Sequence, residues 1–228
     1  MAVGMHDSLP PGRVIRVVLA DDHSAVRAGL RVLLSTDPDI EVIGEAANGA
    51  DAVLRARQLH PDVVLMDVQM PGLDGIGATA QIRAETPVRV LILTTFGLDD
   101  YVEAALAAGA DGFLLKSAPA EEITGALRRV RAGDIVLAPE VTRAVVERSR
   151  RAASAPDPRR NRTLAALTPR ERDVLTQLGW GASNGDIARA LGITEATAKS
   201  HVSRILDKLG VRSRVQAALL LHSENPTE

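Results

Sequence analysis

The chain has 228 residues, 46% of them hydrophobic, which is enough for two domains that each bury a core. It has no cysteine, so disulfides, thiol catalysis and cysteine-bound zinc are excluded. No segment approaches the roughly 18 uncharged apolar residues of a membrane span, and residues 1–12 lack the basic and apolar regions of a signal peptide. We therefore expect a cytoplasmic protein that has no membrane partner and begins with a flexible tail.

The net charge of −2 is unevenly distributed along the chain. Residues 13–132 carry 12 basic and 17 acidic side chains, residues 133–163 carry 7 and 4, and residues 164–222 carry 8 and 5. An acidic front half and a basic rear half suggest one domain that binds cations and another that binds an anion. Ordinary surface charge can produce differences of this size, so charge alone does not establish what either half binds.

The first half of the sequence alternates between strand-like and helix-like segments. Short apolar runs, expected to be strands, occupy residues 14–20, 40–46, 63–66, 89–94 and 112–116. Helix-length segments follow them, at residues 24–35, 50–60, 75–85, 100–109 and 120–133. The first, third and fourth runs are almost continuously apolar, as strands buried on both faces are. Five such units predict an α/β domain with a doubly wound, five-stranded parallel sheet.

After residue 133 the strand signals stop. Residues 139–151 have a helical pattern, and residues 152–162 form an Ala/Pro/Arg-rich stretch expected to be an exposed linker. The following segment is helical, with cap patterns at "TPRE", "SNGD" and "SRVQ", and with Gly192 and Gly210 placed to end helices. The predicted organisation is a tail (1–12), an α/β domain (13–133), a linker helix with a flexible linker (134–163), a small all-α domain (164–222) and a second tail (223–228).

Polar side chains mark the carboxyl ends of the predicted strands. Asp21 and Asp22 follow the first strand, Asp67 follows the third, Thr94 ends the fourth, and Lys116 closes the fifth. In a parallel sheet these ends converge on one crevice. Three carboxylates there would repel one another unless a cation lies among them, and oxygen ligands without His or Cys favour Mg²⁺. A carboxylate beside Mg²⁺, with a hydroxyl and an ammonium nearby, can attack a phosphoryl group and hold the product.

These carboxylates also allow two other interpretations. A single strand-end aspartate commonly caps a helix, but a set on consecutive strand ends points to chemistry. A haloacid-dehalogenase-like phosphatase also uses a strand-end aspartate nucleophile, and it needs a second aspartate two residues later as the general acid. Here that position is Gln69, so fast hydrolysis lacks its acid. The phosphoryl group should therefore persist, as suits a switch.

Three segments together resemble the receiver domain of two-component response regulators: "LADDHSAVRAGL", "PDVVLMDVQMPGLDG" and "LILTTFGLDDYVEAALAAGADGFLLK". The resemblance covers residues 13–133 and implies the flavodoxin-like receiver fold. It implies that a histidine kinase phosphorylates Asp67. It also implies that Asp22, Asp67 and the backbone carbonyl of Gln69 bind Mg²⁺, while Asp21 completes the acidic pocket.

The same resemblance implies how the phosphoryl group is sensed. Thr94 matches the switch hydroxyl, because it precedes Lys116 by the expected spacing of 22 residues. Phe113 matches the aromatic that turns inward when the hydroxyl moves, although a plain core aromatic is an equal alternative. The segment Ser117-Ala118-Pro119 departs from the family, in which many receivers have proline directly after the lysine. This difference concerns the local peptide geometry rather than the chemistry.

The rear half contains two helices joined by a tight turn at residues 192–194. On the second helix, residues at helical spacing predict the stripe that faces the core: Ala198, Val202, Ile205 and Leu209. Ser200 and Ser203 lie opposite this stripe, and Lys199 and Arg204 flank it. Small outward side chains permit close approach to a major groove, while the cations reach phosphates or guanine edges. A solvated amphipathic helix would show the same pattern, and this helix alone does not separate the two interpretations.

The stretch "LTPRERDVLTQLGWGASNGDIARALGITEATAKSHVSRILDKLGVRSRVQAALLL" resembles the LuxR-type helix-turn-helix domain. Joined to a receiver, it is typical of the NarL/FixJ class of response regulators. The resemblance implies a recognition helix at about residues 195–208 and a last helix, 213–221, that often supports dimerisation. The expected DNA-binding residues are Lys199, Ser200, His201, Ser203, Arg204 and Lys208. His201 lies beside the core stripe, so we expect a packing or phosphate contact rather than a metal ligand.

This stretch departs from the family pattern at three positions. Some relatives have a cation or an amide where this chain has Ser203, which leaves the base contacts open. Ala198 replaces the usual valine and Ala182 the usual leucine, which predicts a slightly looser core. Aromatic residues make up only 2% of the chain, and Trp180 is the one stacking platform in this domain. Duplex DNA is therefore a better partner than single-stranded DNA or RNA.

The sequence as a whole predicts a two-component response regulator. A sensor histidine kinase would phosphorylate Asp67, which would shift homodimerisation and sequence-specific binding to duplex DNA and so regulate transcription. No enzymatic activity is expected beyond Mg²⁺-dependent self-phosphorylation and slow dephosphorylation at Asp67. The alternatives are a phosphatase-like enzyme, which would release phosphate in many-fold excess over protein, and a receiver that acts through protein contacts without phosphorylation. DNA binding and association that do not respond to a phosphodonor would favour the latter.

Overall fold

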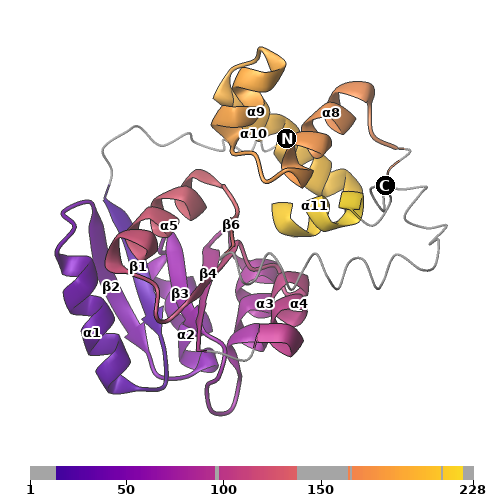
Figure 1. Ribbon diagram of the computed structural model, residues 1–228. Helices are drawn as coiled ribbons and strands as arrows, with labels where there is room; N and C mark the ends of the chain where they lie inside the picture. Colours follow the sequence, from indigo (N-terminus) through magenta and orange to yellow (C-terminus); the bar gives the residue numbers. More distant parts are fainter. Residues whose placement is uncertain (1–13, 96–97, 138–163, 165, 212, 223–228) are drawn as a thin grey trace.

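The computed structural model describes residues 14–95, 98–137, 164, 166–211 and 213–222 (Figure 1). We call residues 14–137 the front domain and residues 164–222 the rear domain. The expected helix at residues 139–151, the linker at 152–162 and both expected tails lie outside the described residues. Within the described residues, no helix is both long enough and apolar enough to cross a membrane.

The front domain alternates strands and helices in the predicted order. Its strands are β1 (Ile15–Ala20), β2 (Ile40–Ala46), β3 (Val63–Asp67), β4 (Arg89–Thr94), β5 (Gly112–Leu115) and β6 (Val136–Leu137). Its helices are α1 (Ser24–Ser35), α2 (Gly49–Leu59), α3 (Gly75–Glu85), α4 (Leu98–Ala107) and α5 (Ala120–Ala132). Each predicted strand and helix of this domain is therefore present, with bounds shifted by at most a few residues.

The strands form one parallel sheet in the order β2-β1-β3-β4-β5-β6. The expectation of five strands is corrected to six, because β6 pairs with β5 through Gly112 and Phe113. This strand has two residues, too few for a hydrophobic period to reveal it, and it lies in the stretch predicted to be a linker. The reversal of strand order at β1 and β3 is the point where ligands bind in doubly wound sheets.

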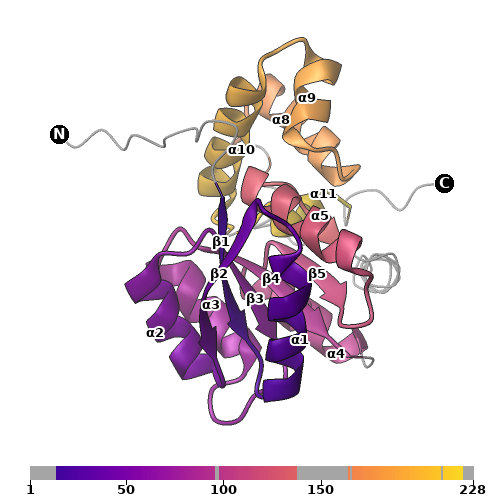
Figure 2. The same ribbon diagram turned by 90° about the vertical axis from the view of Figure 1, so that its left-hand side faces the viewer.

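Helices cover both faces of the sheet. Helices α1 and α5 contact each other on one face, while α2 contacts α3 and α3 contacts α4 on the other (Figure 2). All five residues of β3 are buried, as its continuous apolar run predicts for a central strand. The helices run antiparallel to the strands, so they begin near the carboxyl edge of the sheet and end near the amino edge.

The rear domain consists of α8 (Pro169–Gly179), α9 (Asn184–Leu191), α10 (Glu195–Leu209) and α11 (Arg214–His222). Two predicted capping boxes are present, one formed by Thr168 with Glu171 and the other by Ser183 with Asp186. Gly192 and Gly210 end α9 and α10 in the left-handed conformation, as predicted. The predicted core stripe of α10 is buried at all four positions, Ala198, Val202, Ile205 and Leu209.

Glu171 connects the start of α8 to the end of α10. Its side chain is buried, accepts a hydrogen bond from the backbone N–H of Thr168 at 2.8 Å and lies 2.7 Å from the Nζ of Lys208. The hydrogen bond from Lys208, followed by that from Thr168, lowers the pKa of Glu171 to about 2 from the ordinary 4.5. Because the folded pKa lies below the unfolded one, this stabilisation is fully present above about pH 4.5 and is lost as the pH falls towards 2.

Replacement of Glu171 with glutamine is expected to destabilise the rear domain at pH 7. The loss should be about 1–3 kcal/mol, because the buried side chain at position 171 loses its charge-assisted hydrogen bond with Lys208. Urea unfolding of the wild type and of Glu171→Gln at several pH values would measure it. The stability difference should shrink between pH 4.5 and pH 2. A difference that does not change over this range would contradict the assigned role of the carboxylate.

Candidate functional site

The polar groups expected at the strand ends converge at the carboxyl edge of the sheet. The Nζ of Lys116 lies 2.6 Å from Oδ2 of Asp21 and 2.9 Å from Oδ2 of Asp67. Both carboxylates are buried, with 2% of Asp21 and 5% of Asp67 exposed. One ammonium thus joins two acids that come from β1 and β3, and it projects from the residue directly after β5. This pairing offsets part of the cost of burying the two negative charges.

A tight loop holds Asp67 at the end of β3. The backbone N–H of Val68 donates to Oδ1 of Asp67 at 2.9 Å, and the N–H of Gly75 donates to the carbonyl of Val68 at 2.9 Å. A Cβ atom on Gly75 would lie 1.9 Å from the backbone carbonyl oxygen of Asp67, which no real side chain permits. The start of α3 therefore packs directly against the backbone of Asp67, and only glycine fits there. The sequence interpretation missed this role of Gly75.

The electrostatics of the pocket follow from burial and from this ammonium. Burial raises the pKa of Asp67 above its ordinary value, while the hydrogen bond and charge of Lys116 oppose the rise. Burial alone would lower the pKa of Lys116, but its hydrogen bonds to Asp21 and Asp67 outweigh burial and raise the pKa. Lys116 therefore stays protonated at neutral pH beside a carboxylate oxygen.

The acidic residues provide the oxygen ligands that a hard cation prefers. Carboxylate oxygens of Asp21 and Asp22 and a ring nitrogen of His23 lie within 4.8 Å of one another. The Nδ1 of His23 is 2.6 Å from Oδ1 of Asp22, although the imidazole is largely exposed. Receiver domains generally bind Mg²⁺ at an acidic pocket of this kind, and the donor set fits that ion. His23 was not singled out from the sequence, although its position directly after two strand-end acids could have indicated it.

The two predicted switch residues lie on neighbouring strands. Thr94 ends β4, is 8% exposed, and donates from Oγ1 to the backbone carbonyl of Thr95 at 2.9 Å. The backbone N–H of Lys116 donates to the carbonyl of Thr94 at 2.7 Å, which ties the ends of β4 and β5 together. Phe113 is fully buried on β5, opposite Ile92. Its aromatic ring therefore already lies in the core, and its part in a switch stays a prediction.

The second candidate surface is the outward face of α10. Lys199, Ser200, Ser203 and Arg204 are all exposed there. His201 is half-buried, and its Nδ1 has no hydrogen-bond partner among the described residues, in keeping with a packing position beside the core stripe. Lys208 is exposed as well, but its ammonium contacts Glu171. All of the predicted DNA-binding residues thus lie on α10. Among them, Lys208 forms an ion pair with Glu171 of the same domain.

The two domains together define a class of protein: an α/β domain with an acidic, lysine-containing pocket, followed by a helix-turn-helix domain. Residues 17–128 match the family described as the response regulator receiver domain, and residues 165–221 match the LuxR family of bacterial regulatory proteins. The chain belongs to the response regulators that carry a LuxR-type helix-turn-helix domain. It is thus a DNA-binding regulator of transcription in a two-component system.

Individual relatives support this assignment over most of the chain. The response regulator protein VraR of Staphylococcus aureus is 41% identical over 212 residues, which cover 92% of this chain and 98% of VraR. The crystal structure of ChrA, a response regulator of a heme-sensing two-component system, is 40% identical, covers 92% of this chain and 98% of its own, and has a TM-score of 0.53. A structure of two RcsB dimers bound to two parallel DNAs is 25% identical in sequence and has a TM-score of 0.54. The match covers 94% of this chain and 100% of the RcsB chain.

Proposed function

We propose that Asp67 accepts a phosphoryl group from a sensor histidine kinase and that this event favours homodimerisation and sequence-specific binding to duplex DNA. The observation that most supports the proposal is the contact at 2.9 Å between the Lys116 ammonium and the buried Asp67 carboxylate. A buried acid of this kind, with a second acid on the same ammonium, is poorly explained as a helix cap. It is suited to hold a doubly charged phosphoryl group after transfer.

The transfer step requires one carboxylate oxygen of Asp67 as nucleophile. This oxygen forms a bond to phosphorus, the bond from phosphorus to the leaving nitrogen of the kinase histidine breaks, and that nitrogen keeps the electron pair. With a small acyl phosphate, the leaving atom is an oxygen instead. Lys116 stabilises the negative charge on the phosphoryl oxygens, and the Val68 N–H keeps the carboxylate oriented through its bond to Oδ1.

Four residues would hold Mg²⁺ in this pocket: Asp21, Asp22, Asp67 and, through its backbone carbonyl, Gln69. When bound, the ion neutralises charge on the acidic pocket and on the transferred phosphoryl group. The self-phosphorylation and slow dephosphorylation of Asp67 are the only chemistry proposed. Gln69 is exposed in the loop after β3 and cannot act as a general acid, so the phosphatase alternative has little support.

For DNA recognition, we place α10 in the major groove. The exposed serines of its outward face permit close approach of the helix, and Lys199 and Arg204 flank them. Ser200 donates from Oγ to the carbonyl of Ala196 at 2.9 Å, which holds its side chain against its own helix. Two such helices in a dimer would meet inverted half-sites about one helical turn apart.

Thr94 is proposed to couple phosphorylation to association. Its hydroxyl would leave the Thr95 carbonyl and move towards the phosphoryl oxygens, which would change the surface at β4 and α4. Replacement of Thr94 with alanine should therefore weaken the dimerisation of the phosphorylated protein by roughly 5- to 150-fold, the usual size of such coupling. Sedimentation of both proteins, matched for phosphate content by mass spectrometry, measures this effect. Equal dimer constants would contradict the coupling role.

The function as a whole is tested by treating the full chain with a small phosphodonor and Mg²⁺. Covalent phosphate on Asp67 should appear together with a shift from monomer to dimer. If phosphate appears and association does not change, the dimerisation step of the proposal is wrong. If the protein releases inorganic phosphate in many-fold excess, the phosphatase alternative replaces it.

A further inference from the structure

An arginine of α1 holds the loop that follows β1 from outside the acidic pocket. We call Asp21 and Asp22, which this loop carries, the acidic pair. The Nη1 of Arg27 donates to the backbone carbonyl of Asp21 at 2.6 Å. Its Nε donates to Oε2 of Glu45 on β2 at 3.2 Å, and the side chain of Arg27 is 16% exposed. One guanidinium thus joins the acidic pair to the neighbouring strand, although a guanidinium cannot itself bind a cation.

The energetics of α1 itself do not explain a cation at this position. The backbone N–H of Arg27 donates to the carbonyl of His23, the residue that precedes the helix, so Arg27 lies near the amino end. The helix dipole disfavours a cation there. Arg31 follows four residues later, and like charges at this spacing destabilise a helix. Helix α1, which is described throughout, has no acidic residue in its first turn and no side-chain cap. The contacts of Arg27 outside the helix therefore explain its position.

Glu45 holds the guanidinium of Arg27 in place and balances its charge. The other oxygen of this carboxylate, Oε1, accepts from Arg31. The hydrogen bond from Arg31 lowers the pKa of Glu45, burial opposes the change, and the hydrogen bond from Arg27 adds to it. Glu45 therefore stays ionised at neutral pH. Arg27 and Arg31 share this one carboxylate, and Arg27 in addition reaches the acidic pair.

The bond to the Asp21 carbonyl fixes a peptide plane. This carbonyl and the N–H of Asp22 belong to the same planar group, so the donor that holds one also orients the other. The backbone N–H of Asp21 is held independently, because it donates to the carbonyl of Ala46 at 3.1 Å. The side chain of Asp22 is partly exposed and contacts the largely exposed ring of His23. The direction in which the Asp22 side chain leaves the backbone thus depends on the peptide that Arg27 holds.

We propose that Arg27, held by Glu45, is a positioning residue for the acidic pair and sets the affinity of the pocket for a divalent cation. It orients the carboxylate of Asp22 and does not touch the ion. Groups that hold the ligands of a metal in place commonly change its affinity by about 10- to 100-fold. This inference rests on the proposed function, because it requires the acidic pair to bind Mg²⁺.

The charge of Arg27 has the opposite effect, so the two explanations can be separated. Removal of a cation from behind the acidic pair makes the surroundings more negative, and charge alone would then attract a divalent cation more strongly. Loss of position predicts weaker binding instead. Arg31 provides the matched control, because its removal takes the same charge from Glu45 and leaves the bond between Arg27 and Asp21 in place.

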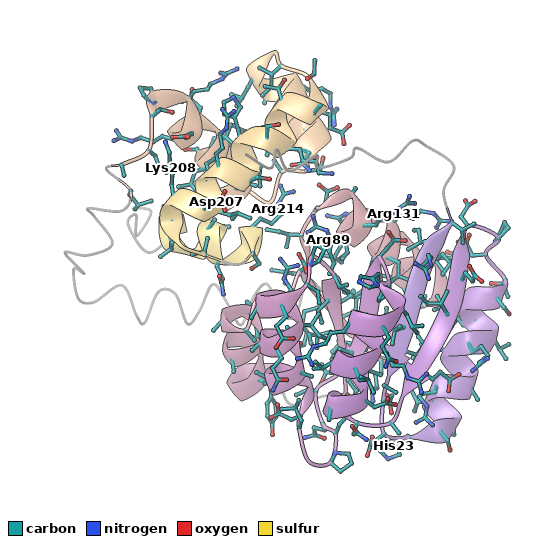
Figure 3. The ribbon with its side chains drawn as sticks, turned by 180° about the vertical axis from the view of Figure 1, so that it is seen from behind. His23, Arg89, Arg131, Asp207, Lys208 and Arg214 are labelled. Atoms are coloured by element: carbon teal, nitrogen blue, oxygen red, sulfur yellow. The ribbon has the colours of Figure 1, made fainter. Side chains whose placement is uncertain are left out.

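The full chain is suitable for the experiment, because the acidic pair and the rear domain lie at opposite ends of the front domain. His23, the residue after the acidic pair, marks one end (Figure 3). The rear domain contacts the other end, where the side chain of Gln216 donates to the carbonyls of Leu106 and Ala107. Substitutions in α1 therefore leave this interdomain contact unchanged.

The measurement is a titration of Mn²⁺, which prefers the same oxygen ligands as Mg²⁺. Electron paramagnetic resonance counts the free ion, and competition by Mg²⁺ gives the affinity for that ion. Methionine replaces arginine, because it keeps an apolar stem and removes every N–H donor. Arg27→Met should bind Mn²⁺ about 10- to 100-fold more weakly than the wild type. Arg31→Met should bind it at least as tightly as the wild type.

The outcomes separate the positioning role from the function on which it rests. A wild type that binds no Mn²⁺, or an Asp22→Asn variant that binds it equally well, overturns the proposed metal site and the inference with it. If the wild type binds at the acidic pair and Arg27→Met binds equally or more tightly, only the positioning role is wrong. The same conclusion follows if Arg31→Met is weakened as much as Arg27→Met, because the bond to Asp21 would then not be responsible.

Chemical rescue tests the guanidinium itself and does not depend on the packing of methionine. In Arg27→Ala, the shortened side chain leaves room for free methylguanidinium at concentrations that do not denature the protein, which circular dichroism monitors. Methylguanidinium should tighten the binding of Mn²⁺ towards the wild-type affinity. It should leave the affinity of Arg31→Ala unchanged. An Arg27→Ala protein whose Mn²⁺ affinity does not respond to methylguanidinium would contradict the role assigned to Arg27.

Discussion

Replacement of Asp67 with asparagine is expected to abolish covalent labelling by a small phosphodonor in the presence of Mg²⁺. Asparagine has nearly the same shape, so its amide oxygen can still accept from the Val68 N–H and the loop before α3 should keep its fold. The amide oxygen is not a competent nucleophile towards phosphorus, and the charge that Lys116 neutralises is lost. The expected effect is therefore complete loss of reaction rather than a reduced rate.

Intact-protein mass spectrometry before and after phosphodonor treatment measures this prediction. The wild type should gain one phosphoryl group, and mild alkali should remove it because phosphoaspartate is an acyl phosphate. Circular dichroism of the variant controls for folding. If Asp67→Asn gains as much phosphate as the wild type, another residue is the acceptor.

The second large effect is expected from Lys199 on the outward face of α10. This residue lies in the first turns of the helix, where helices in a major groove reach base edges. If it contacts a guanine, Lys199→Ala should lose the preference at one base pair, worth about 1–3 kcal/mol, or roughly 5- to 150-fold in affinity. The other base pairs of the site should keep their mismatch penalties.

Arg204 provides the matched comparison, because it lies on the other flank of the outward face of α10, more than one turn later. We assign it to phosphate, so Arg204→Ala should weaken all duplexes alike and reduce the salt dependence by about one counterion. Both alanine variants should be titrated against the native site, single-base mismatches and random duplex at several salt concentrations. If Lys199→Ala retains every mismatch penalty of the wild type, the base contact is wrong. If neither variant changes any affinity, α10 does not enter the groove.

The acidic pocket could be predicted from the sequence because its members share a simple position. Asp21, Asp67, Thr94 and Lys116 all occur where a strand ends or directly follows one, and the ends of parallel strands converge. The contacts of Lys116 with Asp21 and Asp67 then follow from the topology alone. The helix bounds of the rear domain could also be predicted from the sequence. Capping residues such as Thr168 and Gly192 interact only with the helix that they begin or end.

The interdomain contact could not be predicted in this way. Asn184 and Gln216 lie in the cap patterns "SNGD" and "SRVQ", and the patterns explain these residues without any partner. In the structure, Ser183 and Ser213 do make the cap hydrogen bonds, while Asn184 and Gln216 also reach the front domain. Gly75 was missed for a related reason, since only the folded loop brings its backbone against Asp67. Contacts between segments that are distant in the sequence produce no periodic pattern of residues from which they could be predicted.

The central claim is that phosphate on Asp67 strengthens binding to specific duplex DNA. The most direct measurement takes duplexes selected from a random pool by the purified protein and compares the affinity for them with and without a phosphodonor, at one fixed salt concentration. The wild type should bind about 5- to 150-fold more tightly after labelling, and Asp67→Asn should show the same affinity under both conditions. Wild-type protein that carries phosphate on Asp67 yet binds the selected duplex with unchanged affinity would contradict the account.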